Sequence, residues 1–173
     1  MFPGQDELLS RFQPLPERGG AGCVTVAVAE DDAVSRKVIL RQLERFSVET
    51  IGSADGLKLI NAIRRHPVEA VFLDLNMPVM DGWTAARSIR SGQAGPQNQD
   101  TLLVAISTEP SVASRERCRS CGFDWFLEKP LSLFLLGRIL DRIGVTAGPD
   151  RHPGSSGGRS RILPLSRRAA QNF

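Results

Sequence analysis

Residues 72–82 read FLDLNMPVMDG, and this stretch decides the fold of the chain. It contains the end of a short, mostly apolar run, residues 70–75, which carries Asp74 and then passes into a turn rich in Met, Pro, Asp and Gly. An apolar run of this length that ends abruptly at polar residues is typical of a strand buried on both faces of a parallel sheet. The stretch therefore predicts a strand over 70–75 and a helix that starts near Trp83.

The same alternation of strand and helix continues in both directions from this strand. Further strands are predicted at 24–29, 48–51, 102–106 and 124–127, and further helices at 34–46, 57–63, 111–121 and 131–143. Five strands alternating with five helices predict an α/β fold, a doubly wound five-stranded parallel sheet in the flavodoxin-like order 2-1-3-4-5. Because ligands of such folds bind beyond the carboxyl ends of the strands, the chemistry is expected there.

The composition is that of an ordinary globular domain. Of the 173 residues, 41% are apolar and 24% charged, close to the average for soluble proteins, and the length suits one domain with tails. The N-terminus lacks the pattern of a secretory signal, and no apolar run is long enough to span a bilayer. We therefore expect a soluble, cytoplasmic protein with no membrane partner and with reduced cysteines.

The net charge of +3 is concentrated in one part of the chain. After Gly148 there are five arginines and one aspartate, which leaves the rest of the chain close to neutral. The sequence predicts a loosely ordered leader over 1–22, a domain over 23–144 and a basic, disordered tail over 145–173. A near-neutral domain is not expected to bind nucleic acid. A nuclear-localisation patch in the tail is the weaker alternative to a solvated tail.

Charged and hydroxyl side chains stand at the predicted strand ends: Glu30, Asp31, Asp74, Ser107 and Lys129. In the predicted strand order the first and third strands are neighbours, so the three carboxylates converge and repel one another. A hard divalent cation relieves that repulsion, and Mg²⁺ is the natural candidate. An aspartate beside Mg²⁺ can act as a nucleophile toward phosphorus, while a lysine and a hydroxyl stabilise the phosphoryl oxygens.

Four motifs, VAEDD (28–32), FLDLNMPVMDG (72–82), AIS (105–107) and FLEKP (126–130), together resemble the receiver domain of two-component response regulators. The resemblance covers about residues 24–143 and implies a role for each matching residue. It assigns phosphorylation to Asp74, and Mg²⁺ binding to Glu30, Asp31, Asp74 and the backbone carbonyl of Asn76. Ser107 and Lys129 match the switch hydroxyl and the lysine of the family. Pro130 matches a proline that usually follows a cis peptide bond.

Four positions set the switching and timing that the resemblance implies. Phe126 stands where the family has an aromatic residue, often tyrosine, that moves between exposed and buried positions. Thr108 stands where a small Ala or Gly is usual, so we expect it to slow access of the phosphodonor. Asn76 and Glu109 occupy the variable positions that tune how water reaches the phosphoryl group.

The resemblance predicts a phosphoacceptor in a two-component phosphorelay that takes a phosphoryl group from a histidine kinase or a histidine phosphotransfer protein onto Asp74 and switches a binding surface. Such a protein catalyses only its own phosphorylation and dephosphorylation. One alternative is a degenerate receiver that acts as a docking module. The complete charged set counts against it, and Thr108 keeps it open. Another is a small phosphohydrolase that forms an aspartyl-phosphate. The asparagine at position 76 counts against it, because haloacid-type phosphatases have a second aspartate there.

Simpler interpretations remain for several residues. Asp31 or Asp32 could be only a helix cap. Cys118 and Cys121 have the spacing of a redox or zinc half-site, but no second Cys/His pair completes it, so simple packing is favoured. The polar helix over 111–121 has Val112 as its one clear aliphatic anchor and is therefore expected to be loosely held, either as a switching face or as an ordinary exposed helix.

Overall fold

Each strand and helix predicted from the sequence is present in the computed structural model, which describes residues 23–145 and 162–164. The strands are β1 (Thr25–Ala29), β2 (Glu49–Ser53), β3 (Ala70–Asp74), β4 (Leu102–Ser107), β5 (Trp125–Glu128) and β6 (Ile162–Pro164). The helices are α2 (Ala33–Glu44), α3 (Gly56–Ile63), α4 (Gly82–Arg90), α5 (Val112–Cys121) and α6 (Leu133–Leu140), with short 3₁₀ helices η1 (Pro96–Asn98) and η2 (Asp141–Ile143).

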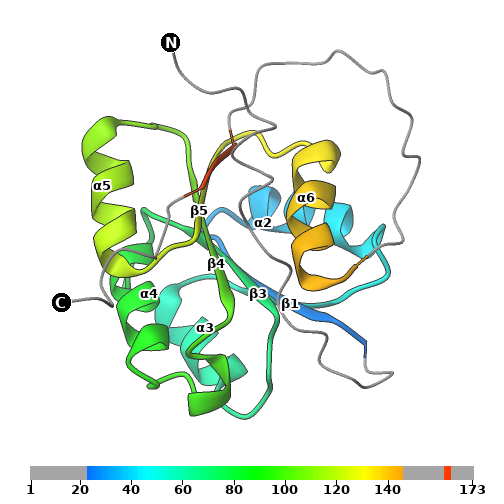
Figure 1. The fold of residues 1–173 in the computed structure, drawn as a ribbon, viewed down its shortest axis with the longest axis horizontal. Helices are drawn as coiled ribbons and strands as arrows, with labels where there is room; N and C mark the ends of the chain where they lie inside the picture. The colour runs from blue at the N-terminus through cyan, green and yellow to red at the C-terminus, as the bar shows by residue number, and fades with distance from the viewer. Residues whose placement is uncertain (1–22, 146–161, 165–173) are drawn as a thin grey trace, which may run out of the picture.

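The strands form a single sheet in the order β2-β1-β3-β4-β5-β6 (Figure 1). The first five are parallel, which confirms the predicted flavodoxin-like order, and β6 adds an antiparallel strand beside β5. Residues 162–164 lie in the tail that the sequence predicts to be disordered, and a three-residue strand has too short a pattern to be recognised there. The rest of that tail and the leader over 1–22 fall outside the described residues.

Apolar side chains cover both faces of the sheet because successive strand residues point to opposite sides. From β1, Val26 and Val28 pack toward α2 and α6, while Ala27 and Ala29 pack toward α3, α4 and α5. Figure 1 shows the same division, with α2 and α6 together on one side and the other three helices on the opposite side. With both faces covered, the polar ends of the strands remain for chemistry.

Each of the five helices begins with a side chain that caps its exposed backbone N–H groups. In every case the capping oxygen accepts a hydrogen bond from the amide three residues later, which is the usual N-cap arrangement. The caps are Asp32 to Ser35 (2.7 Å), Asp55 to Lys58 (2.8 Å), Asp81 to Thr84 (2.7 Å), Ser111 to Ser114 (3.0 Å) and Ser132 to Leu135 (3.3 Å). The choice left open between Asp31 and Asp32 is resolved, since Asp32 caps α2.

Two details of the last helices differ from the sequence prediction. The predicted helix over 131–143 is α6 followed by the separate turn of η2, with Ser132 as its cap. The expectation that Val112 anchors α5 is wrong, because its side chain is 72% exposed. The buried residues of α5 are Cys118 and Cys121, which agrees with a packing role for these two thiols. Val112 is the first residue of α5.

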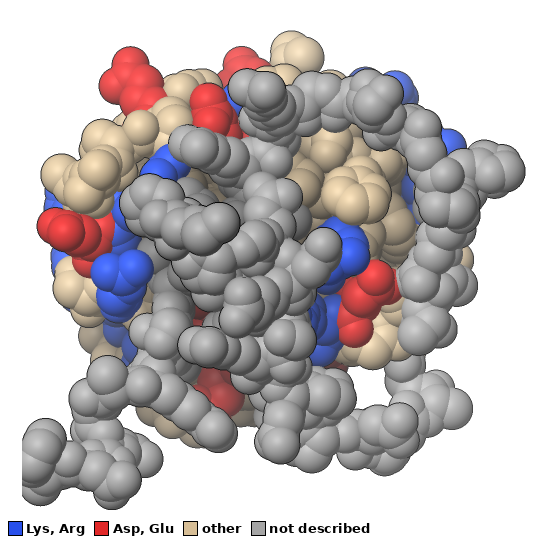
Figure 2. Space-filling model, turned by 45° about the horizontal axis from the view of Figure 1, so that its top comes forward, with Lys and Arg blue, Asp and Glu red and all other residues tan. Residues whose placement is uncertain are grey.

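The part of the chain that the structure describes has short helices, and both kinds of charge are visible on the face seen in Figure 2. None of its helices combines the length and apolar character that crossing a bilayer requires. Where described residues are visible in Figure 2, basic and acidic side chains lie near one another. The expectation that the domain is not a general nucleic-acid binder stays a prediction.

Candidate functional site

The pairing of β1 with β3 brings two buried carboxylates together. Ala29 is paired with Leu73 in the parallel ladder, so the next residues along each strand, Glu30 and Asp74, come side by side at the carboxyl edge. The amide of Glu30 also donates to the carbonyl of Ser53 at 3.1 Å, which ties this turn to β2. The convergence expected from the strand order is therefore present.

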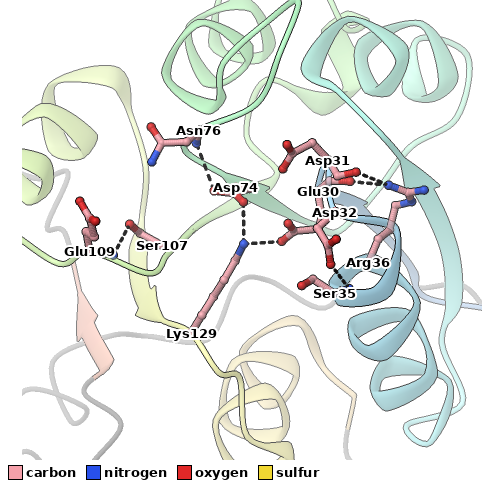
Figure 3. Close-up of polar contacts among 10 residues, drawn as sticks. All are labelled: Glu30, Asp31, Asp32, Ser35, Arg36, Asp74, Asn76, Ser107, Glu109 and Lys129. Atoms are coloured by element: carbon pink, nitrogen blue, oxygen red, sulfur yellow. Dashed lines mark hydrogen bonds and ion pairs between the residues drawn. The ribbon is translucent and has the colours of Figure 1, made fainter.

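The same edge continues through β4 to β5. Asp74 pairs with Ile106, and Ser107 with Glu128, so that Ser107 and Lys129 follow at successive strand ends. The amide of Lys129 donates to the carbonyl of Ser107 at 2.9 Å and holds the start of the β5–α6 connection against β4. Figure 3 shows these side chains gathered at one edge of the sheet.

Glu30, Asp31 and Asp74 form an acidic cluster in which one oxygen of each lies within 4.8 Å of the others. Glu30 is 1% exposed and Asp74 6% exposed, whereas Asp31 is open to solvent. Burial raises the pKa of Glu30, and the nearby Asp74 carboxylate raises it further. A set of oxygen ligands with one open side is typical of sites for hard divalent cations.

Lys129 is the positively charged side chain that forms ion pairs with the acidic cluster among the described residues. Its Nζ lies 2.6 Å from Glu30 Oε2 and 2.6 Å from Asp74 Oδ2. Burial disfavours the charged form of Lys129, but its hydrogen bonds to Asp74 and Glu30 outweigh that effect, so the pKa of the lysine is raised. One lysine against three carboxylates leaves the site with an excess of negative charge.

The remaining polar residues surround Asp74 without crowding it. The amide of Asn76 donates to Asp74 Oδ1 at 3.1 Å, while the Asn76 side chain is exposed. The buried Ser107 hydroxyl accepts from the amide of Glu109 at 3.1 Å. Thr108 and Glu109 are both exposed and follow Ser107 directly in the chain. These positions suit groups that would meet an incoming ligand.

Phe126 and Pro130 lie on either side of Lys129 in the chain. Phe126 is 1% exposed, with the guanidinium of Arg115 at 5.5 Å from the centre of its ring. The aromatic side chain that the resemblance expects to move is therefore in its buried position. The peptide bond between Lys129 and Pro130 is cis, as the resemblance implies.

One contact of the site was not found by reading the sequence. Arg36, in α2, donates from Nη1 to the backbone carbonyls of Glu30 at 2.6 Å and Asp31 at 3.3 Å. Its position inside a helix with several other basic residues gives no sign of this contact. Only the spacing of Arg36 from the acidic turn could have indicated the contact, because helical side chains lean back toward the N-terminus of their helix.

The chain matches a family model described as the response regulator receiver domain over residues 26–141. It is 34% identical over 122 residues to the peroxide stress-activated histidine kinase mak1 of Schizosaccharomyces pombe. That alignment covers 69% of this chain and 7% of the yeast protein. The chain thus spans a small fraction of the length of this curated relative.

Two solved structures have the same fold. The receiver domain of sensor histidine kinase PA1611 from Pseudomonas aeruginosa, solved with a magnesium ion in its active site cleft, superposes with a TM-score of 0.64 at 28% identity, over 71% of this chain and 99% of that one. The receiver domain of Ssk1 from Saccharomyces cerevisiae, in complex with the histidine phosphotransfer protein Ypd1, gives a TM-score of 0.59 at 21% identity, over 66% and 83% of the two chains.

Proposed function

This chain belongs to the response regulator receiver domain family, and from that membership we infer that Asp74 accepts a phosphoryl group from a phosphohistidine partner in the presence of Mg²⁺. The observation that carries the inference is the cluster of Glu30, Asp31 and Asp74 with a single lysine across it. Such a site is short of positive charge and has an open side, so it can take up a cation together with a phosphoryl group.

The carboxylate oxygens of the cluster suit Mg²⁺ in type. Mg²⁺ is usually held by one or two carboxylates, with its other positions left to water and phosphate oxygens. Glu30, Asp31 and Asp74 would hold it, together with the carbonyl of Asn76 that the family resemblance assigns. When bound, the ion neutralises the charge that builds up on the phosphoryl oxygens during transfer.

The proposed transfer forms one bond and breaks one. An Asp74 carboxylate oxygen attacks the phosphorus of phosphohistidine, a P–O bond forms, and the P–N bond breaks with its electron pair leaving on the imidazole nitrogen, which takes up a proton. Lys129 must release Asp74 Oδ2, to which it is now bonded at 2.6 Å, and can then pair with a phosphoryl oxygen. Hydrolysis by water returns the carboxylate and inorganic phosphate.

Ser107 and Phe126 would carry the phosphorylation state to the surface. The Ser107 hydroxyl is buried at the strand end beside Asp74, so turning it toward a phosphoryl oxygen would break its bond from the Glu109 amide. The space released would favour rearrangement around Phe126 and α5. Because phenylalanine has no hydroxyl, the output surface must read its position and not a phenol hydrogen bond.

The proposed donors are a histidine kinase or a histidine phosphotransfer protein, and the exchange would take place in the cytoplasm. Histidine kinases among the relatives and the Ypd1 complex of a receiver with the same fold support the choice of donor. The downstream effector would bind the switched surface. In this account the chain catalyses only its own phosphorylation and dephosphorylation.

Intact-mass analysis of the full chain incubated with Mg²⁺ and acetyl phosphate separates this proposal from its alternatives. We expect the wild type to gain the mass of one phosphoryl group and the Asp74→Asn variant to gain none. A wild type that stays unmodified would support a docking module. Steady turnover of phosphomonoesters would support a phosphohydrolase, which the asparagine at position 76 disfavours.

A further inference from the structure

We propose that Arg36 is a positioning residue for the Mg²⁺ site, since it fixes the backbone of the acidic turn that supplies Glu30 and Asp31. The inference rests on the proposed function, because it concerns the same cation. Arg36 contacts none of the carboxylate oxygens of the cluster in the described contacts; it binds backbone carbonyls instead. Figure 3 shows its guanidinium beside the turn and on the far side of Glu30 and Asp31 from Lys129.

The position of Arg36 in its helix accounts for this contact. Asp32 caps α2 by accepting from the Ser35 amide, and the Arg36 amide donates to the Asp32 carbonyl at 2.9 Å as the first helical bond. A side chain in this turn leans toward the helix N-terminus and so reaches the residues before the cap. Nη1 then donates to Glu30 O at 2.6 Å and to Asp31 O at 3.3 Å.

The acidic turn is thereby held from two sides. The Glu30 amide donates to Ser53 on β2, and the Glu30 carbonyl accepts from Arg36 on α2. The Asp31 carbonyl accepts from the same guanidinium nitrogen, while its carboxylate remains exposed. Fixing the backbone at both residues restricts where their carboxylate oxygens can point before a cation arrives, which lowers the ordering cost of binding.

The charge of Arg36 adds to this effect without occupying the ligands. The guanidinium carries a positive charge, which offsets part of the repulsion among the three carboxylates. Lys129 also offsets that repulsion, but it binds Glu30 Oε2 and Asp74 Oδ2 and must give them up to a cation. Arg36 can stay in place when the cation binds, because its partners are carbonyls.

The test measures the Mg²⁺ dissociation constant of the full chain by isothermal titration calorimetry, with Mg²⁺ alone as the ligand. We expect Arg36→Met to weaken binding about tenfold, the lower end of the effect seen when groups that orient metal ligands are removed. Lys37→Met is the matched control, because it removes the same charge from the neighbouring, exposed position. We expect that variant to change the constant by less than about twofold, and less still at high salt.

A conservative variant and a stability measurement exclude a general folding effect. Arg36→Lys keeps the charge but not the planar donor set, so its affinity should fall between those of wild type and Arg36→Met. Urea unfolding without Mg²⁺ shows whether each variant is folded at the temperature of the titration. If Arg36→Met is unfolded there, the proposal still requires that Arg36→Lys weaken Mg²⁺ binding more than Lys37→Met does.

Equal affinities for the Arg36 variants and Lys37→Met would overturn the positioning role while leaving the proposed function intact, provided that the wild type binds Mg²⁺ and becomes phosphorylated. A wild type that binds no Mg²⁺ would overturn both. Weaker binding by the Arg36 variants, with normal phosphorylation of the wild type at saturating Mg²⁺, supports both.

Discussion

Arg90 and Lys129 are both largely buried cations that hold carboxylates at the sheet, but they lie at opposite edges and are bonded differently. At the amino edge, Arg90 pairs with Asp124 at 2.7 Å and also donates to three backbone carbonyls, those of Gln99, Thr101 and Gly122. At the carboxyl edge, Lys129 pairs with Glu30 and Asp74 of the acidic cluster, which also contains Asp31.

The difference separates a structural cluster from a functional one. Arg90 and Asp124 balance one another in charge, and Asp124 Oδ2 also accepts from the Leu103 amide at 2.8 Å, so that cluster holds the chain together without a ligand. The Lys129 cluster has more negative than positive charge and is open on the side of Asp31. Burial alone does not mark a functional site; uncompensated charge at an accessible edge does.

Arg90→Met is expected to have the largest effect on stability. Removing Arg90 takes the guanidinium away from the buried Asp124 carboxylate and removes its hydrogen bonds to three backbone carbonyls, so we expect a loss of about 3 kcal/mol in the free energy of unfolding. Urea titration measures it. The control is Lys58→Met, which removes a lysine 70% exposed and paired with Asp55 and should cost less than about 0.5 kcal/mol. Equal losses in the two variants would contradict the structural role of Arg90.

Mg²⁺ should stabilise the wild type through the acidic cluster. A ligand present at one hundred times its dissociation constant adds about 2.7 kcal/mol to the free energy of unfolding. Asp31→Asn should abolish most of this gain because it removes an open ligand. Asp32→Asn is the matched control, since asparagine still caps α2 and Asp32 is outside the cluster. A gain retained in Asp31→Asn but lost in Asp32→Asn would place the cation elsewhere.

Lys129→Met tests whether the two edges respond differently to a cation. Without Mg²⁺, Glu30 and Asp74 lose their partner, and we expect a loss of about 2 kcal/mol in unfolding free energy, less than for Arg90 because fewer bonds are lost. Added Mg²⁺ should raise the free energy of unfolding of Lys129→Met by more than it raises that of the wild type, because the ion no longer competes with the lysine. Mg²⁺ added to Arg90→Met should raise its free energy of unfolding only as much as it raises that of the wild type. Chemical denaturation with and without Mg²⁺ distinguishes these results.

Val79→Gly is expected to have a smaller, stabilising effect. Val79 follows Asp74 in the turn to α4 and has φ of 68°, a left-handed conformation that is unfavourable for a β-branched residue. By comparison, the left-handed position at the end of α5, near the amino edge of the sheet, is occupied by a glycine, Gly122, with φ of 89°. We expect Val79→Gly to raise the free energy of unfolding by about 1 kcal/mol. Val38→Gly, at a half-exposed helical valine, should lower it, and a loss in both variants would contradict strain at Val79.

Much of the fold and of the candidate site could be predicted from the sequence because each depends on local patterns at strand ends. The apolar runs fix β1 and β3, and their parallel order alone places Glu30 beside Asp74. The cap at Asp32 was open between two neighbouring aspartates, since only the helix start decides which one is used.

The contacts that could not be predicted join residues distant in sequence or act through the backbone. Arg90 meets Asp124 across 34 positions, and its other partners are carbonyls, which leave no trace in residue identity. Arg36 likewise binds carbonyls. The exposure of Val112 was missed because an aliphatic residue in a polar helix was assumed to face the core, whereas Cys118 and Cys121 do so.

The most direct test of the account is to locate the phosphoryl group after the full chain has been incubated with acetyl phosphate, with and without Mg²⁺, by tandem mass spectrometry of its peptides. The account predicts modification at Asp74, at a rate that falls sharply when Mg²⁺ is chelated. Modification at another residue, or at Asp74 with an equal rate in the absence of Mg²⁺, would contradict the claim that the excess negative charge at this edge serves a cation and a phosphoryl group.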